Sequence, residues 1–464
     1  MSPVFDPMRL SAVSLDVLAA SRGNADAIAQ RQQVRLQRLV QAAQRDSVFY
    51  AQHLQAVMAG APLAQLPMVT RGELMGSFDE WVTDPRLKLD ALRAFAADPT
   101  RLAEAYLGRY MVWVSSGTSG QPGVFVQNTQ AMAVYDALEA LRRDAPRPQL
   151  RWLDPMFLGE RIAFVGAIGG HFASVVSIER LRQINPLMAR AMRCFSILQP
   201  TAQLVAALNA YAPTVLTTYP SAAALLAAEA AAGRLTVPLR EVWTGGELLS
   251  PAVRQRITRS LDCDLRNSYG ASEFLTLGWE CGHGSLHLNA DWAVLEAVDA
   301  QHRPVPAGEW SSSCLLTNLA NTVQPLIRYE LGDPIRYEPE PCACGSPLPV
   351  ISVQGRHDEP LRIRGATSRE VTLLPMALTT VLEDEAGVFD FHLRQIDGRR
   401  LLLQLHQIGA AADEAAVRAV AALQTYARSQ GIDRLQIDTE TGQPAPLGPS
   451  GKTCRVVAAP GVRR

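Results

Sequence analysis

The N-terminal hundred residues show apolar positions at helical spacing, which predicts helices that pack against a core. An amphipathic helix is predicted over residues 26–54, with its apolar face formed by Leu36, Leu39, Val40 and Ala43. Thr70 precedes Glu73 by three residues, the capping-box pattern of a helix start, and another helix is predicted around residues 87–95. These elements are expected to serve packing, and none is expected to contribute to chemistry.

Strand and helix patterns alternate in the middle of the chain. Apolar runs that end in glycine or polar residues predict strands, and helical patterns lie between them. These elements occupy residues 161–172, 207–233, 241–250, 251–261 and 264–267. The order predicts βαβ units with a largely parallel sheet, in which ligands bind beyond the carboxyl ends of the strands. The segments Thr244–Glu247 and Asn267–Glu273 lie at such ends.

The pattern changes twice in the remaining chain. Short alternating strands between Pro and Gly turns predict a small β subdomain over residues 292–337. After a charged connector, α+β structure is predicted, with a helix, a hairpin, a long helix and two strands, the first three at residues 373–385, 389–408 and 412–430. This segment has the size of a separate domain. We therefore expect an α/β protein with two domains, residues 1–355 and 356–464.

Composition narrows the class of protein. The chain has 464 residues, too many for one ordinary core, and its 48% apolar and 19% charged residues are typical of a globular protein. A net charge of -1 gives no electrostatic reason to expect nucleic acid or an acidic membrane as a partner. No apolar run approaches the ~20 residues of a membrane span, and the pattern of a secretory signal is missing. We therefore expect a cytoplasmic protein.

A glycine-rich loop between two apolar runs is the first candidate for chemistry. Residues 114–127 read VSSGTSGQPGVFVQ, a polar loop between two predicted strands. Glycines let backbone N–H groups approach a phosphate closely, and hydroxyls add donors. The loop lacks the Walker A pattern, and taken alone an ordinary hairpin turn explains it equally well. The candidate phosphate contacts are Ser115, Ser116, Gly117, Thr118, Ser119 and Gly120.

Two further motifs follow this loop in a recognisable order. They are NSYGASE (Asn267–Glu273) and PLIRYELGD (Pro325–Asp333). With them the chain resembles the adenylate-forming enzymes of the acyl-CoA synthetase (ANL) superfamily over most of its length, and most closely the branch that contains phenylacetate–CoA ligase. The resemblance implies a large N-terminal adenylate-forming domain with mixed or parallel sheets, helices and a small β subdomain. It also implies a small C-terminal α+β domain that acts as a mobile lid.

The resemblance assigns a nucleotide site to the large domain. Thr118 and its loop would hold the β- and γ-phosphates of ATP, Glu273 would bind Mg²⁺, and Tyr269 would flank the adenine or the acyl pocket. Asp333 would accept both ribose hydroxyls, a role that suits the two oxygens of a carboxylate. The turn along the adenine would consist of Gly245, Gly246 and Glu247. Without the resemblance, a surface acid explains Glu273 better than a metal ligand does, and the turn is a tight connection from strand to helix.

The resemblance also assigns a hinge and a catalytic lysine to the C-terminal region. Arg356 would contact the ribose and phosphates, and Asp358 would be the hinge of the lid. Lys452, in a glycine-flanked turn, would bridge the substrate carboxylate and the α-phosphate. After the lid rotates, Gly365 would lie where a pantetheine arm passes. Gln121 departs from the family, in which lysine is common at this position, and so removes a positive charge from the phosphate loop.

Four residues in two turn-rich segments predict a metal site. Cys281 and His287 lie in ECGHGSLH, and Cys342 and Cys344 lie in EPCACGSP. Three thiols and one imidazole match a closed structural Zn²⁺ site, and the phenylacetate–CoA ligase branch has a similar set. Such a zinc would stabilise the β subdomain and take no part in catalysis. Four unrelated residues are the alternative, with His283 as the competing imidazole.

The acid substrate is the part that the sequence specifies least. The expected pocket is apolar and aromatic and includes Tyr135, His171, Tyr219 and Ala271, which favours an aryl or arylacetic acid; a core position explains His171 at least as well. The predicted activity is that of an AMP-forming aryl-CoA ligase that uses ATP, Mg²⁺ and CoA. Transfer to the pantetheine thiol of an acyl carrier protein, transfer to an amine, and a non-catalytic nucleotide-binding relative are the alternatives. A homodimer is compatible with each.

Overall fold

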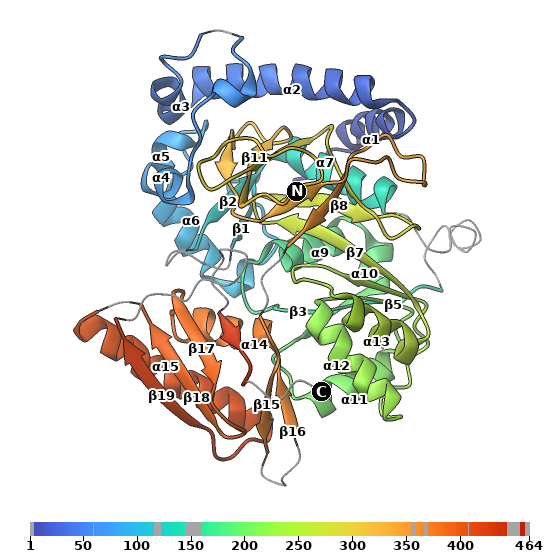
Figure 1. Cartoon of the computed structure of the whole chain (residues 1–464), viewed down its shortest axis with the longest axis vertical. Helices are drawn as coiled ribbons and strands as arrows, with labels where there is room; N and C mark the ends of the chain where they lie inside the picture. The colour runs from blue at the N-terminus through green and yellow to red at the C-terminus, as the bar shows by residue number, and fades with distance from the viewer. Residues whose placement is uncertain are drawn as a thin grey trace.

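The computed structural model describes residues 4–58, 60–115, 122–143, 159–354, 358–365, 370–406, 408–442 and 455–459. A large α/β region extends to residue 354, and a smaller α+β region begins at residue 358 and lies beside its lower part (Figure 1). This arrangement confirms the predicted fold class. The predicted boundary between residues 355 and 356 falls outside the described residues. Within the described residues, the helices are all too short or too polar to span a bilayer.

The N-terminal helices cover one end of the large region (Figure 1). They are α1 (Pro7–Ser21), α2 (Ala25–Asp46), α3 (Val48–His53), α4 (Arg71–Gly76), α5 (Phe78–Trp81) and α6 (Leu89–Ala96), with short 3-10 turns at Leu63–Gln65 and Pro99–Arg101. The single helix predicted over residues 26–54 is broken at Ser47, whose side chain caps α3 by accepting from the N–H of Tyr50. The capping box of Thr70 and Glu73 is confirmed at the start of α4.

A nine-stranded mixed sheet forms the centre of the large region, in the order β13-β14-β9-β8-β7-β6-β5-β3-β4. We call β3 to β7 the parallel half, because these strands pair in parallel, and β8, β9, β13 and β14 the antiparallel half. The strands are β3 (Ile162–Gly166), β4 (Met192–Ser196), β5 (Val215–Thr218), β6 (Glu241–Thr244), β7 (Asp264–Ala271), β8 (Phe274–Glu280), β9 (Leu286–Leu288), β13 (Ile335–Tyr337) and β14 (Val350–Val353).

Helices connect the strands of the parallel half, which confirms the predicted βαβ units. They are α9 (Ala173–Ile184), α10 (Pro186–Ala191), α11 (Thr201–Tyr211), α12 (Pro220–Ala231) and α13 (Pro251–Leu261). Before them, β1 (Met111–Val114) and β2 (Val124–Gln127) form the predicted hairpin around the glycine-rich loop, followed by α7 (Thr129–Arg142). Alanine and leucine residues of these helices pack against the sheet because parallel strands are apolar on both faces.

The predicted β subdomain is smaller than expected. It consists of one three-stranded sheet of β10 (Ala293–Val298), β11 (Ser313–Asn318) and β12 (Tyr329–Glu330). The prediction that the subdomain extends to residue 337 is wrong, because β13 pairs with β14 and so belongs to the nine-stranded sheet. Period-two alternation reveals a strand, but it does not show with which sheet the strand pairs.

The C-terminal region has an apolar core of its own. Its elements are β15 (Leu361–Arg364), β16 (Glu370–Leu373), α14 (Pro375–Thr380), a π-helical turn (Val381–Glu385), β17 (Phe391–Gln395), β18 (Arg400–Leu405), α15 (Ala410–Ser429), β19 (Gln436–Thr441) and β20 (Val456–Val457). Ile197 and Ala222 of the large region pack against this core, and Gln430 donates to the carbonyl oxygen of Leu198 at 2.8 Å. The two regions are therefore in direct contact.

Candidate active site

A large cavity lies at the carboxyl ends of the parallel half, where the sequence predicted ligand binding. Its volume is about 1670 Å³, and residues at the ends of β3, β5, β6 and β7 line it together with residues of the C-terminal region. Small-molecule sites usually have volumes of roughly 300–1,000 Å³. The cavity is therefore large enough for two substrates side by side, and the C-terminal region closes part of it.

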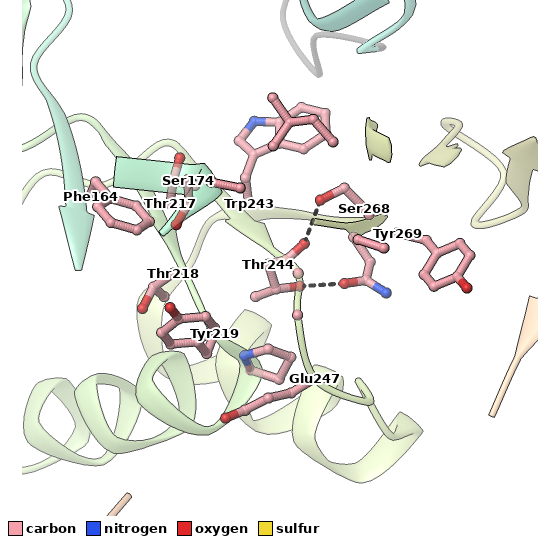
Figure 2. A pocket seen from close by; sticks show the side chains of 18 of the residues that line it. Phe164, Ser174, Thr217, Thr218, Tyr219, Trp243, Thr244, Glu247, Ser268 and Tyr269 are labelled. Atoms are coloured by element: carbon pink, nitrogen blue, oxygen red, sulfur yellow. Dashed lines mark hydrogen bonds between the residues drawn. The ribbon is translucent and has the colours of Figure 1, made fainter. Parts of the chain in front are cut away.

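The turn after β6 depends on two glycines. Gly246 has a φ of +77°, and a Cβ at this residue would lie 3.2 Å from the ring of Tyr219. A Cβ on Gly245 would lie 2.8 Å from the Oγ of Ser268. Thr244 fixes the turn by donating to the Oδ1 of Asn267 at 2.9 Å (Figure 2). Both glycines line the cavity, so the turn presents backbone without side chains to it. A turn that lies along a flat adenine ring, as the resemblance implies, needs such a surface.

Glu247 connects this turn to the start of α12. Its carboxylate accepts hydrogen bonds from the N–H and from the hydroxyl of Ser221, both at 2.9 Å. Burial raises the pKa of Glu247 to about 7, although the bonds from Ser221 oppose the shift. The side chain lies below Tyr219 at the edge of the cavity (Figure 2). Glu247 therefore fixes the position of the turn and changes its charge near neutral pH.

Asp333, the predicted ribose contact, faces the cavity beside Tyr269. The hydroxyl of Tyr269 donates to the Oδ2 of Asp333 at 2.8 Å, and both residues line the cavity. A register shift between Tyr269 and Ala271 interrupts the pairing of β7 with β8 at this point. Burial and the Asp333 carboxylate raise the pKa of Tyr269 well above its usual value, so the hydroxyl remains a donor at neutral pH. The pair thus holds a carboxylate at the cavity.

Glu273, the predicted magnesium ligand, belongs to a buried polar cluster. Its Oε1 accepts from the guanidinium of Arg71 at 3.0 Å and from the hydroxyl of Tyr329 at 2.8 Å. Arg71 also donates to the Tyr329 oxygen at 3.1 Å. The Oε2 of Glu273 has no hydrogen bond among the described residues, and Glu273 lines the cavity. This oxygen suits a hard cation such as Mg²⁺.

Arg71 is a site residue that the sequence did not reveal, since the N-terminal elements were expected to serve packing only. It lines the cavity, and its Nη1 is buried without a hydrogen-bond partner among the described residues. Burial opposes its charge, but Glu273 and Tyr329 raise the pKa of Arg71 above its usual value. No local pattern signals this position: Arg71 reaches the cavity because Val69 pairs with Tyr329, more than 250 residues away in the chain.

Ser115, at the start of the glycine-rich loop, is held by two hydrogen bonds to Gly123. Ser115 donates its N–H to the Gly123 oxygen at 2.9 Å, and its Oγ accepts from the N–H of Gly123 at 3.0 Å. Ser115 is buried and lines the cavity. The other predicted phosphate contacts and the departure from the family fall outside the described residues: Ser116, Gly117, Thr118, Ser119, Gly120 and Gln121.

Aromatic and hydroxyl side chains line the part of the cavity between β3, β5 and β6. Phe164 and Trp243 lie on either side of the hydroxyls of Ser174 and Thr217 (Figure 2). The predicted pocket residues Tyr135, Tyr219 and Ala271 also line the cavity. His171 does not: it is buried with its ring 5.5 Å from that of Phe95, and burial lowers its pKa. The prediction of His171 as a pocket residue is therefore wrong, and the core position holds instead.

The C-terminal region meets the cavity through the predicted hinge. Asp358 lines the cavity and accepts from the N–H groups of Arg455 and Val456 at 2.7 and 3.0 Å. The Arg455 guanidinium pairs with the buried Glu383 at 2.7 Å. Asp358 therefore ties the start of the C-terminal region to the strand near its end. Arg356 and Lys452 fall outside the described residues, and Gly365 is a buried residue directly after β15.

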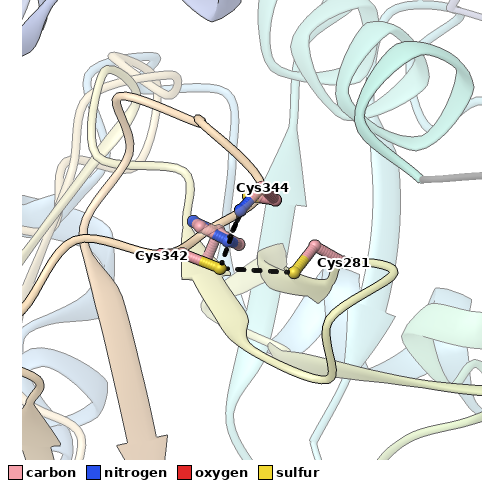
Figure 3. A group of neighbouring side chains, drawn as sticks. Cys281, Cys342 and Cys344 are labelled. Carbon is pink, nitrogen blue, oxygen red and sulfur yellow. Dashed lines mark hydrogen bonds between the residues drawn. The ribbon is translucent and has the colours of Figure 1, made fainter.

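The four predicted metal ligands lie together, and Figure 3 shows the three cysteines among them. The ligand atoms of Cys281, His287, Cys342 and Cys344 are all within 4.8 Å of one another. The sulfurs of Cys281 and Cys342 are 3.7 Å apart, and the Cys344 sulfur is 3.3 Å from the Nε2 of His287. A tetrahedral zinc with Zn–S bonds of about 2.3 Å places its sulfurs about 3.8 Å apart. The Nδ1 of His287 lies 3.0 Å from the Leu348 carbonyl oxygen, which orients Nε2 toward the sulfurs.

The position of this cluster differs from the prediction. Cys281 follows β8, His287 lies in β9, and Cys342 and Cys344 lie between β13 and β14. A metal at the cluster would therefore join outer strands of the nine-stranded sheet, whereas the sequence placed it in the small β subdomain. The loop between β13 and β14 has little regular structure, so a metal would add a cross-link to the hydrogen bonds that join it to β9.

Comparison with solved structures identifies a shared fold. The chain matches a crystal structure of 2-hydroxyisobutyryl-CoA ligase in complex with 2-HIB-AMP and CoA, with a TM-score of 0.58 and 20% identity over 95% of this chain and 91% of that chain. It also matches the same ligase in the postadenylation state with R3-HIB-AMP, with a TM-score of 0.53 and 19% identity over 94% and 89% of the two chains. No protein-family model and no curated protein matches. The fold is that of adenylate-forming acyl-CoA ligases, as the sequence predicted.

Proposed function

We propose that this protein is an ATP-dependent acid–thiol ligase, which activates a carboxylic acid as an acyl-AMP and transfers the acyl group to CoA. One observation carries the proposal. The bare-backbone turn at Gly245 and Gly246, the Tyr269–Asp333 pair and the Arg71–Glu273 pair come from distant segments, yet they line one cavity. Together they offer a flat slot, a carboxylate for ribose hydroxyls, and a cation beside a carboxylate for phosphates and Mg²⁺.

In the first half-reaction, a carboxylate oxygen of the acid attacks the α-phosphorus of ATP, and pyrophosphate leaves. Asp333 would accept the ribose hydroxyls, and Glu273 would hold Mg²⁺, which neutralises charge on the phosphates when bound. The buried Nη1 of Arg71 is available for phosphate oxygens and offsets the charge that Gln121 does not supply. Lys452 would bridge the acid and the α-phosphate. The described chain just after it reaches the cavity, since Arg455 and Ala458 line it.

In the second half-reaction, the thiol sulfur of CoA attacks the acyl carbonyl carbon, and AMP leaves. We assign Asp358 as the hinge that lets the lid replace Lys452 with the segment around Gly365. Its two hydrogen bonds to backbone N–H groups at Arg455 and Val456 couple the turning point to the strand that follows Lys452. A small residue such as Gly365 suits the passage of a pantetheine arm close to the backbone.

For the acid we propose an aromatic carboxylate, aryl or arylacetic. Phe164 and Trp243 supply apolar ring faces for offset or edge contacts, and Tyr135 closes the pocket with its buried ring. The hydroxyls of Ser174 and Thr217 lie between the first two and can bind one polar ring substituent. An acid with a single hydroxyl or amino group on the ring is thus expected to bind more tightly than the bare ring.

For the cysteine cluster we propose a structural Zn²⁺. The Cys3His donor set and the sulfur separation of 3.7 Å fit a closed tetrahedral site with no position open for substrate. When bound, zinc would supply cross-linking and no step of the reaction.

The proposal is tested by pyrophosphate release with ATP and Mg²⁺ against a panel of aromatic and short hydroxy acids, each with and without CoA. We expect release that depends on one acid and turns over many times only when CoA is present. Acid-dependent release that stays near a single turnover with CoA would replace CoA by a carrier-protein thiol or an amine. The absence of release with every acid would favour a non-catalytic nucleotide-binding protein.

The role of Lys452 is tested separately. Lys452→Ala should abolish acid-dependent release while the Kd for ATP stays within about twofold, because the lysine acts on the transition state more than on bound ATP. Arg463→Ala, near the same end of the chain, is the matched control. Equal loss of ATP binding and release in the Lys452 variant would contradict the assigned role.

A further inference from the structure

One face of the parallel half of the sheet is apolar but packs into no core. On the opposite face, residues such as Val165, Leu216 and Val242 pack with α11, α12 and α13. On this face, apolar residues line the cavity and belong to none of the apolar cores that the described residues form: Ile162, Phe164, Met192, Val215 and Trp243. Protein interiors are close-packed, so an apolar wall that meets no packing partner borders space for a ligand.

The register of the strands arranges these side chains in two rows, because residues that pair across parallel strands point to the same face. The row nearest the amino ends of the strands consists of three paired residues of β4, β3 and β5: Met192, Ile162 and Val215. The second row lies two residues nearer the carboxyl ends, on β3, β5 and β6: Phe164, Thr217 and Trp243 (Figure 2). The proposed aromatic ring binds at the second row, so the first row lies about 7 Å beyond it.

A stripe of α9 forms the facing wall. This helix follows β3 and leads back toward the start of β4, which pairs with β3 in parallel. Ser174, Ile178, Leu181 and Ile184 follow one another at helical spacing and line the cavity, whereas Val176 points to another side and is buried in a core. The three apolar members of the stripe are half-buried and belong to none of the cores of the described chain. From Ser174 to Ile184 the stripe is about 15 Å long, enough to face both rows.

Two acidic residues of α7 beside this space are already paired within the protein. The Asp136 carboxylate accepts from the Arg180 guanidinium at 2.9 Å, and Glu139 forms an ion pair with Arg143 at 3.0 Å. The Arg143 guanidinium also lies over the ring of Trp243, 4.1 Å from its centre. These pairs leave the apolar walls as the feature that selects the ligand, and such walls favour an uncharged, apolar group.

We propose that this space binds an apolar tail of the acid, attached to the ring on the side away from the carboxylate. We call it the tail chamber and define it by its two walls: Met192, Ile162 and Val215 of the sheet, and Ile178, Leu181 and Ile184 of α9. The inference rests on the proposed ligase function and deepens it, because the chamber continues the proposed acid pocket and names a subclass of aromatic acids. An extended chain advances about 1.2 Å per bond, so about 7 Å corresponds to a tail of about six carbon atoms.

The test is acid-dependent exchange of pyrophosphate into ATP with a series of benzoic acids that carry unbranched 4-alkyl tails of one to ten carbon atoms. For wild type, kcat/KM should rise roughly fourfold with each methylene that the chamber buries. The rise should end near six carbon atoms, where the walls end. A kcat/KM that stays level or falls from the 4-methyl acid onward would overturn the proposal.

Two substitutions in the chamber should shift this profile in opposite directions. Val215→Phe fills the chamber, so the ratio of kcat/KM for the 4-hexyl acid to that for the 4-methyl acid should fall roughly 50-fold, the gain of about three methylenes. Met192→Ala deepens it, so the best tail should become longer, and this variant decides the question if Val215→Phe does not fold. Val417→Phe, at an exposed residue of α15, is the matched control and should keep the wild-type profile. Equal losses for both acids in Val215→Phe, or an unchanged optimum in Met192→Ala, would overturn the proposal.

Binding separates the tail chamber from the ligase function. Calorimetry with AMP present measures the Kd of the 4-hexyl and 4-methyl acids without turnover. Tighter binding of the 4-hexyl acid by wild type but not by Val215→Phe, with no exchange for any acid, would support the chamber and refute the ligase chemistry. Exchange with short acids and no preference for a tail in either measurement would do the reverse.

Discussion

The two halves of the nine-stranded sheet differ in how their strands end. In the parallel half, β3, β5, β6 and β7 all end at one edge. The last residues of β5, β6 and β7 line the cavity, and so does Ala167, directly after β3. In the antiparallel half, neighbouring strands end at opposite edges, so no common edge forms. A cysteine–histidine cluster joins the outer strands there instead. Parallel pairing gathers polar strand ends into one place, and antiparallel pairing disperses them.

This difference assigns separate tasks to the two halves. The parallel half carries groups that change or hold charge at the cavity, such as Glu247 and the Tyr269–Asp333 pair. The antiparallel half carries a closed donor set that faces no substrate. Glu273 lies at the junction, between β7 and β8, where its partner Arg71 comes from the N-terminal helices. We therefore expect substitutions in the antiparallel half to reduce stability, and substitutions at the junction to reduce both stability and activity. Substitutions at the carboxyl ends of the parallel strands, which we call the parallel edge, should act mainly on the site.

The largest effect is expected from the metal cluster. Cys342→Ser/Cys344→Ser should abolish bound zinc and lower the free energy of unfolding by on the order of 5 kcal/mol or more, since structural zinc contributes its binding energy to folding. At a temperature where the variant remains folded, the KM for ATP should stay within about twofold. Metal analysis and denaturant unfolding measure the two quantities. Cys263→Ala, a cysteine outside the cluster, is the control. Loss of activity with an unchanged unfolding curve would give the cluster a catalytic role.

The second effect is expected at the junction. Arg71→Met leaves the Glu273 carboxylate buried without its cation, which should lower the free energy of unfolding by about 3–5 kcal/mol and strongly reduce pyrophosphate release. Arg71→Met/Glu273→Gln should recover most of the stability, because no unpaired charge remains, but none of the activity. Denaturant unfolding and acid-dependent exchange are the measurements. Recovery of activity in the double variant would show that Arg71 serves packing alone.

The junction also shows where sequence reasoning stops. Gly245, Gly246 and Asp333 were predicted because the short motifs that contain them resemble those of a known family. The cysteine ligands were predicted because three thiols and an imidazole in two turn-rich segments match a metal site. Arg71 belongs to no such motif. Its place at the cavity depends on the pairing of Val69 with Tyr329, which lie in segments far apart in the chain. The same cause explains β13, whose alternation was visible but whose partner strand was not.

A third effect, on pH dependence, is expected at the parallel edge. The pKa of a glutamate in an unfolded chain is about 4.3, whereas burial raises that of Glu247 to about 7. A raised pKa stabilises the fold below pH ~4, and this contribution is lost as the pH rises through 7. The loss amounts to about 4 kcal/mol. Glu247→Gln should therefore flatten the fall in unfolding free energy between pH 5 and pH 8, whereas Glu414→Gln, on the exposed face of α15, should not.

The smallest effect should come from a single hydroxyl at the same edge. Tyr269→Phe removes the hydrogen bond to Asp333 but keeps the ring, so the carboxylate loses its orientation and not its charge. One such bond contributes about 1 kcal/mol, which corresponds to a roughly fivefold rise in the KM for ATP. The KM for the acid should not change, because Tyr269 acts on the nucleotide through Asp333. A change confined to the KM of the acid would instead place Tyr269 in the acyl pocket, which is the other role that the resemblance allows. The acid would then bind next to β7, at a position that we assign to the nucleotide.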